Sequence, residues 1–113
     1  MVAQQELARR FAAGHDVTGI GSASNLSVES TAREGYDAVL LGYGHAVYAA
    51  RRTDGSVVRF DGWRGYSQST TCQLTELRKG FKCLPESKQT VDTANRPKLR
   101  DFHTADPEPL AAV

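Results

Sequence analysis

The stretch that decides the fold is HAVYAARRTDGSVVRF, residues 45–60. Two apolar runs flank Asp54-Gly55, and this arrangement is the strongest short-range indication of a β-hairpin. We therefore predict one strand over residues 45–52 and another over residues 57–60, joined by a two-residue turn. The pairs expected from such a turn are Arg52 with Val57, Arg51 with Val58 and Ala50 with Arg59.

The residues before this hairpin extend the sheet. Ala38-Val39-Leu40-Leu41 is short and apolar, as expected for a buried strand. Gly42-Tyr43-Gly44 follows, and because glycine weakens a strand interior we predict a kink or bulge there within one continuous run. The sequence thus predicts a small antiparallel sheet of about three strands.

Two helices are expected around this sheet. In residues 2–13 the apolar side chains recur at helical spacing, and Gly14 supplies a stop. The second helix is expected over residues 70–79, where Thr70-Thr71-Cys72-Gln73 fits a capping box and Gly80 ends the helix. We predict that this helix packs on one face of the sheet, which makes the fold class α+β.

Two segments show no clear periodicity. Residues 14–37 carry glycine and serine throughout, so we expect a winding loop there. After residue 84 apolar residues become sparse, and three prolines from residue 97 onward break any long helix. We expect a single domain over residues 1–84. An irregular extension, residues 85–113, is expected to be partly ordered to about Phe102 and to end in a mobile tail.

The composition is that of an ordinary globular protein. The 113 residues are 40% hydrophobic and 24% charged, with a formal net charge of +1. No run of about 18 apolar residues is present, so we expect no membrane partner. The first residues lack the basic and apolar regions of a secretory signal, which indicates a cytoplasmic protein with reduced cysteines. A domain of this size buries a modest core, and a homo-oligomer would enlarge it.

The small net charge hides an uneven distribution. Residues 1–50 carry a net −2, residues 51–82 a net +4 and residues 83–113 a net −1. Aromatic residues are interleaved with the central arginines, a combination typical of protein interfaces and of surfaces that bind nucleic acid. A solvated sheet face above buried aromatic rings would leave the same pattern. The residues expected to make contacts are Arg51, Arg52, Arg59, Trp63, Arg64, Tyr66 and Arg78.

Two side chains are candidates for catalysis. Cys72 lies in the first turn of the second expected helix, where the helix dipole activates a thiol, and His45 would serve as its base. A buried, unreactive thiol fits the same position, since no motif surrounds either residue. We expect no metal site, because Cys72 and Cys83 are eleven residues apart and no CxxC or HxxxH pair is present. No cofactor is expected either.

Three short motifs resemble a small domain found in tailed bacteriophages and other microbial mobile elements. The matching segments are Gly44-His45-Ala46-Val47-Tyr48-Ala49-Ala50-Arg51, Val57-Val58-Arg59-Phe60 and Tyr66-Ser67-Gln68-Ser69-Thr70-Thr71. Cys72 and Leu74 stand where the pattern tends to carry serine and histidine, so no site on that histidine is implied. The domain has no established activity, and the resemblance implies a phage accessory protein in the bacterial cytoplasm.

We therefore expect a non-enzymatic binding protein, encoded by a phage, that engages a bacterial host protein and modulates it. A nucleic-acid-binding accessory protein that uses the same basic and aromatic surface is the first alternative. The second alternative, from a different class, is a small Cys/His enzyme.

Overall fold

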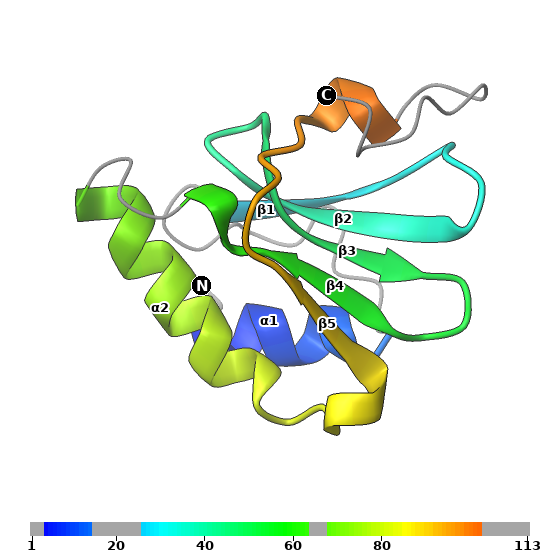
Figure 1. The fold of residues 1–113 in the computed structure, drawn as a ribbon, viewed down its shortest axis with the longest axis horizontal. Helices are drawn as coiled ribbons and strands as arrows, with labels where there is room; N and C mark the ends of the chain where they lie inside the picture. Colours follow the sequence, from blue (N-terminus) through cyan, green and yellow to red (C-terminus); the bar gives the residue numbers. More distant parts are fainter. Residues whose placement is uncertain (1–3, 15–25, 64–67, 103–113) are drawn as a thin grey trace.

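The structure is a computed structural model that describes residues 4–14, 26–63 and 68–102. Within these residues, five strands form one sheet in the order β1-β2-β3-β4-β5 (Figure 1). The strands are β1 (Leu26–Ser30), β2 (Tyr36–Gly42), β3 (Ala46–Arg52), β4 (Val57–Phe60) and β5 (Gln89–Asp92). Neighbours from β1 to β4 are antiparallel, whereas β5 is parallel to β4. The α+β class is confirmed, but the sheet is larger than the three strands expected and is mixed.

Two α-helices, α1 (Gln4–Ala12) and α2 (Gln68–Phe81), pack side by side against the sheet (Figure 1). Their buried apolar side chains are Leu7, Ala8, Phe11, Ala12, Leu74, Leu77 and Phe81. The rings of Phe11 and Phe81 meet edge to face, with centroids 6.3 Å apart. The two helices predicted from apolar spacing are therefore confirmed.

The ends of α2 differ from those predicted. The helix begins at Gln68, two residues before Thr70, so the capping box expected at Thr70 is wrong. Gly80 lies inside the helix and does not end it. A Cβ at Gly80 would lie 2.4 Å from the backbone oxygen of Gln5 and 2.6 Å from Cβ of Ala8. Glycine is therefore the residue that lets α1 approach α2 closely.

The chain reverses direction between β2 and β3, where a kink in one strand was expected. Tyr43 and Gly44 have φ angles of 55° and 81°, and the N–H of His45 donates to the oxygen of Gly42 at 3.3 Å. Positive φ at both central residues is typical of a type I′ turn over residues 42–45, and three residues separate Gly42 from its strand partner Ala46. A tyrosine in this left-handed conformation costs about 1–2 kcal/mol. The predicted continuous strand is therefore wrong.

The hairpin predicted at Asp54-Gly55 is present, but its register differs by one residue. The observed pairs are Arg51 with Val57, Ala50 with Val58 and Ala49 with Arg59. The N–H of Arg52 donates to the oxygen of Ser56 at 2.8 Å, and this bond closes a three-residue loop. Gly55, at φ 90°, takes the left-handed third position of that loop. Because the loop has one residue more than predicted, each residue of β4 pairs one position earlier on β3 than expected. A shift of one residue places the paired side chain on the opposite face of the sheet.

Asp54 makes the stability of this loop depend on pH. Its Oδ1 accepts hydrogen bonds from the hydroxyl of Ser56 at 2.6 Å and from the Ser56 N–H at 2.8 Å. These bonds, the hydroxyl bond first, lower the pKa of Asp54 from its ordinary value of 3.8. Because the folded pKa lies below the unfolded one, the stabilisation is complete above the unfolded pKa. It is lost as the pH falls through the folded pKa.

As the pH is lowered from about 5 to 2, we expect the melting temperature of Asp54→Asn to fall less steeply than that of the wild type. Asparagine keeps an acceptor oxygen for Ser56 but has no charge to lose. Melting curves followed by circular dichroism check this result. The control is Glu34→Gln, which replaces an exposed carboxylate in the β1–β2 turn. The prediction would be contradicted if the melting temperatures of the Asp54 variant and the wild type fell equally steeply at acid pH.

The residues after α2 belong to the folded body as far as Phe102. β5 follows a 3-10 turn, η2 (Glu86–Lys88), and the chain then crosses the end of β4. There Nε of Arg96 donates to the oxygen of Gly62 at 2.5 Å, within η1 (Asp61–Trp63). Pro97 next accepts a hydrogen bond from the N–H of Val47 at 3.0 Å. This segment is therefore tied to β3 and η1 instead of forming an irregular extension.

Phe102 completes the core, and the orange turn that it ends lies across the sheet from α1 in Figure 1. It ends η3 (Leu99–Phe102) and is fully buried. Its ring centroid lies 5.3 Å from that of Tyr36 and 6.4 Å from that of Phe60. Its backbone oxygen accepts the N–H groups of Ala32 and Arg33. The tail predicted after Phe102 lies outside the described residues.

The loop predicted over residues 14–37 is corrected in part. Residues 26–30 form β1 and pair with β2 along their whole length, while residues 15–25 lie outside the described part of the chain. In that described part, no helix has both the length and the apolar character needed to cross a membrane.

Candidate functional site

Trp63, which was expected to contact a partner, is buried in the core. Only 5% of the residue is exposed. Its Nε1–H donates to the backbone oxygen of Val47 at 3.0 Å, and its ring meets Tyr48 edge to face with centroids 6.5 Å apart. The expectation of a surface contact is wrong for Trp63, because the indole already has its hydrogen-bond partner inside the fold.

Arg51 is also buried and binds groups of the same chain. Its Nε donates to Oδ1 of Asp37 at 2.9 Å, and Nη1 donates to the backbone oxygen of Phe11 at 2.6 Å. The guanidinium lies over the Phe11 ring, 5.2 Å from its centroid. Arg51 therefore ties β3 to β2 and to the last turn of α1, and its side chain is not available to a partner.

The other predicted contact residues do not form one exposed surface. The Arg59 side chain is 13% exposed, and its Nη1 lies 4.0 Å from Oδ2 of Asp61. Arg52 is half-buried, with Nη1 3.4 Å from the hydroxyl of Ser56. Arg78 is half-buried on α2, and Arg64 and Tyr66 lie outside the described residues. The hairpin thus lacks the basic surface that its sequence suggested.

His45 and Cys72 are both exposed, and no hydrogen bond joins them within the described residues. Nδ1 of His45 lies 3.2 Å from the backbone oxygen of Tyr43 in its own turn. Cys83 is also exposed. Cys72 and Cys83 are both free thiols. They lie at opposite ends of α2: the helix rises about 13 Å between Cys72 and Phe81, which is more than the Cα–Cα distance of a disulfide. Among the described residues, no group of three or more His, Cys, Asp or Glu side chains is placed to hold a metal ion.

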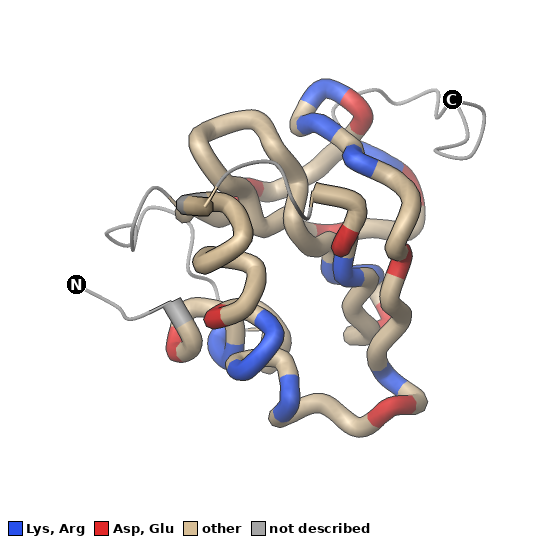
Figure 2. The backbone as a smooth tube through the Cα atoms, turned by 60° about the vertical axis from the view of Figure 1, so that its left-hand side comes forward, with Lys and Arg blue, Asp and Glu red and all other residues tan. Residues whose placement is uncertain are grey.

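Basic side chains do gather on the two helices and on the turn that follows α2, and we call this region the helix-pair surface. Its residues are Arg9, Arg10, Arg78, Lys79, Lys82, Glu6 and Glu76, with a net charge of +3. Figure 2 shows the blue segments of the two helices at one corner of the molecule. The close contact at Gly80 brings the charges of α1 beside those of α2.

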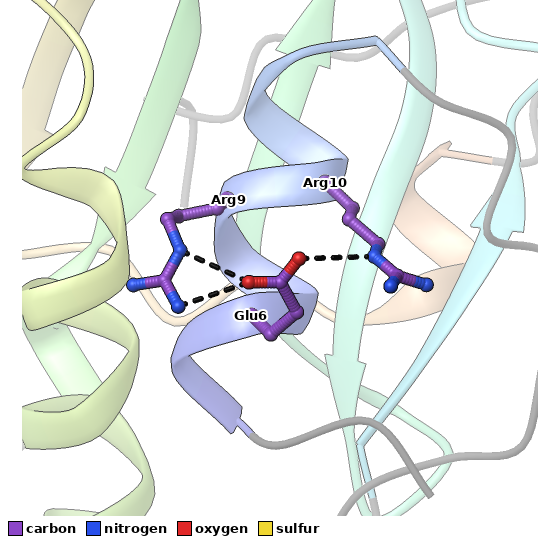
Figure 3. A network of polar contacts seen from close by, with 3 residues as sticks. All are labelled: Glu6, Arg9 and Arg10. Carbon is purple, nitrogen blue, oxygen red and sulfur yellow. Dashed lines mark hydrogen bonds and ion pairs between the residues drawn. The ribbon is translucent and has the colours of Figure 1, made fainter.

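Ion pairs hold several of these cations in place. The Glu6 carboxylate pairs with Arg9 at 2.9 Å and with Arg10 at 3.1 Å. Figure 3 shows Arg9 extending toward α2 and Arg10 extending away from it, at the margin of the surface. The hydrogen bond from Arg9, and then that from Arg10, lower the pKa of Glu6. Glu6 therefore keeps its charge, and both guanidinium groups stay close to it at the surface.

The α2 side of the surface is built in the same way. Glu76 pairs with Lys79 at 3.0 Å and accepts a hydrogen bond from the amide of Gln5 at 3.2 Å. The bond from Lys79, followed by that from Gln5, lowers the pKa of Glu76. Lys82 is exposed and has no ion-pair partner among the described residues. Two fixed carboxylates are thus surrounded by a larger number of cations.

Sequence reasoning missed Arg9 and Arg10 because they lie in a segment with a net negative charge. The signal available was the helical spacing of residues 2–13, which places both arginines on the polar face. No protein-family model, no curated protein and no solved structure matches this chain.

Proposed function

We propose that this protein is a non-enzymatic accessory protein of a phage that binds a protein of its bacterial host, in the host cytoplasm, and modulates it. The observation that carries the binding role is the helix-pair surface, where five basic and two acidic side chains lie on two packed helices and on the turn after α2. The resemblance of residues 44–71 to a phage domain supports the origin. The partner that fits this surface is a protein with an acidic patch.

The arrangement of charges favours a protein over a nucleic acid. Glu6 and Glu76 are interleaved with the cations and bind three of them directly. A continuous row of phosphates would be repelled by both carboxylates, whereas a protein surface can place basic groups opposite them. Surfaces that bind duplex DNA are usually more strongly basic than a net +3.

The exposed position of the lysines indicates how they act. Charges at the rim of an interface steer the two proteins together and set the association rate, and salt screens this effect. We therefore expect the helix-pair surface to determine how fast the complex forms. The small Cys/His enzyme is not favoured, because His45 bonds within its own turn and not to Cys72.

Lys79→Gln together with Lys82→Gln is expected to slow association with the host partner about tenfold at low salt. The partner is first recovered with the wild-type chain, identified and purified, and the rates are then measured by biolayer interferometry. The matched control is Lys88→Gln with Arg100→Gln, which removes the same charge from exposed residues of η2 and η3, away from both helices.

Three results would contradict the proposal. The first is an equal loss of rate in the control pair, which would reflect net charge alone. The second is an association rate that does not change with salt in the wild type. The third is preferential binding of a 20-base-pair DNA duplex, with an affinity that falls steeply with salt.

A further inference from the structure

The β2–β3 turn contains one residue, Tyr43, whose backbone conformation is unfavourable for its side chain. Gly42 is required, because a Cβ there would lie 2.3 Å from the ring of Tyr48. Gly44 adopts a φ of 81°, which suits glycine. Tyr43, between them, has a φ of 55°, where a bulky side chain is strained. Asparagine or glycine is the residue that a type I′ turn prefers at this position.

The side chain of Tyr43 contributes little to the folded body. It is 44% exposed and, with Val91 at 42%, is one of the two large apolar side chains exposed among the described residues. Its hydroxyl makes no hydrogen bond within that part of the chain, and only its backbone oxygen is used, by His45. Strained residues that the fold does not need are found mainly at functional sites.

The turn is connected to the first half of α2. The Tyr48 hydroxyl donates to Oε1 of Gln73 at 3.0 Å, and both residues are buried. Burial raises the pKa of Tyr48, a hydrogen bond with Thr70 opposes this, and the neighbouring Tyr43 phenol adds to it. Figure 1 shows the β2–β3 turn at the upper left, on the same side of the view as the start of α2.

This part of α2 differs from the helix-pair surface in carrying no charge. The first charged residue of the helix is Glu76, and the residues described as exposed before it are Gln68, Thr71, Cys72 and Thr75. One cation, Lys98, comes from the segment that bridges to Ala46 beside the turn. Interface centres are depleted of charge and enriched in tyrosine, whereas single-stranded nucleic acid needs a row of cations beside its stacking rings.

We propose that Tyr43 is an aromatic anchor that enters an uncharged pocket on the partner protein, with the uncharged first half of α2 packing around it. The inference rests on the proposed function, because it requires a protein partner. The tight turn fixes the backbone that carries the ring before binding, so little backbone freedom is lost on association. Tyr43 therefore determines how long the complex lasts, while the helix-pair surface at the other end of α2 determines how fast it forms.

Tyr43→Asn separates these roles from folding. Since asparagine suits the turn, we expect the melting temperature to stay the same or rise by a few degrees. Affinity for the purified host partner is expected to fall about 30-fold, mainly through faster dissociation at every salt concentration. Two controls accompany it. Tyr43→Phe keeps the ring and should bind within about threefold of the wild type, and Val91→Thr removes the other exposed apolar side chain without effect.

Each remaining outcome would overturn the anchor. An unchanged affinity of Tyr43→Asn would show that the ring makes no contact, and a clear fall in its melting temperature would show that tyrosine serves the fold. Weaker binding of a fluorescein-labelled 20-nucleotide thymidine strand, with unchanged binding of the protein partner, would assign the ring to base stacking. If only the lysine variants weaken binding, the anchor fails and the proposed function stands; if no host protein binds, both fail.

Discussion

Gly80→Ala is expected to destabilise the protein by about 2–3 kcal/mol, the upper part of the range of about 1–3 kcal/mol for overpacking a well-packed contact. The same change inside an exposed helix normally stabilises it by about 1 kcal/mol. Here the new methyl group would lie 2.4 Å from a backbone oxygen of α1, which cannot rotate away as a side chain would. The helices must therefore separate, and the contact between Phe11 and Phe81 is lost with them.

Urea unfolding followed by circular dichroism measures this loss. The control is Thr75→Ala in the same helix, where the side chain is exposed and bonds only to the backbone oxygen of Thr71. Its stability should change by no more than about 0.5 kcal/mol. If Gly80→Ala proved as stable as the wild type, the close approach of α1 to α2 would be wrong.

Trp63→Ala is expected to cost about 3–5 kcal/mol, the usual range for removing a large buried aromatic side chain. The change leaves a cavity beside Tyr48 and removes the donor that bonds the backbone oxygen of Val47. Trp63→Phe, which keeps a ring but loses the N–H group, should cost less. Because the chain has a single tryptophan, unfolding is followed by circular dichroism instead of fluorescence.

The size of this effect changes how binding experiments are read. Loss of partner capture by a Trp63→Ala chain would report unfolding, whereas Tyr43→Asn and the lysine variants leave the core untouched. If a Trp63→Ala chain were as stable as the wild type but no longer bound its partner, Trp63 would be a contact residue and not a core residue.

The elements predicted correctly are those that short-range interactions determine. Helices α1 and α2 follow from the spacing of apolar residues, and the Asp54-Gly55 hairpin follows from its turn residues. β1 was missed because its serine-rich sequence becomes a strand only by pairing with β2. β5 was missed for the same reason, because it pairs with β4, and the whole of α2 separates the two strands in the sequence.

The candidate site was harder to predict because burial is decided by distant residues. Arg51 looks like any other arginine of the hairpin until the oxygen of Phe11, 40 residues earlier, is placed beside it. In the sequence, the charges of Arg9 and Arg10 are offset by acidic neighbours, while the fold turns Arg9 toward α2, which carries Lys79. Tyr43 carries no signal in sequence, because its strain depends on whether Gly42-Tyr43-Gly44 bends a strand or reverses it.

The position of Phe102 has a consequence for how the chain is made. It closes the core against Tyr36 and Phe60, and its backbone oxygen is bound by residues about 70 positions earlier, including Thr31. During synthesis from the N-terminus, these partners leave the ribosome well before Phe102 does. The nascent sheet therefore exposes aromatic surface until translation passes residue 102, and its final closure is a slow, long-range step during which chaperones would bind it.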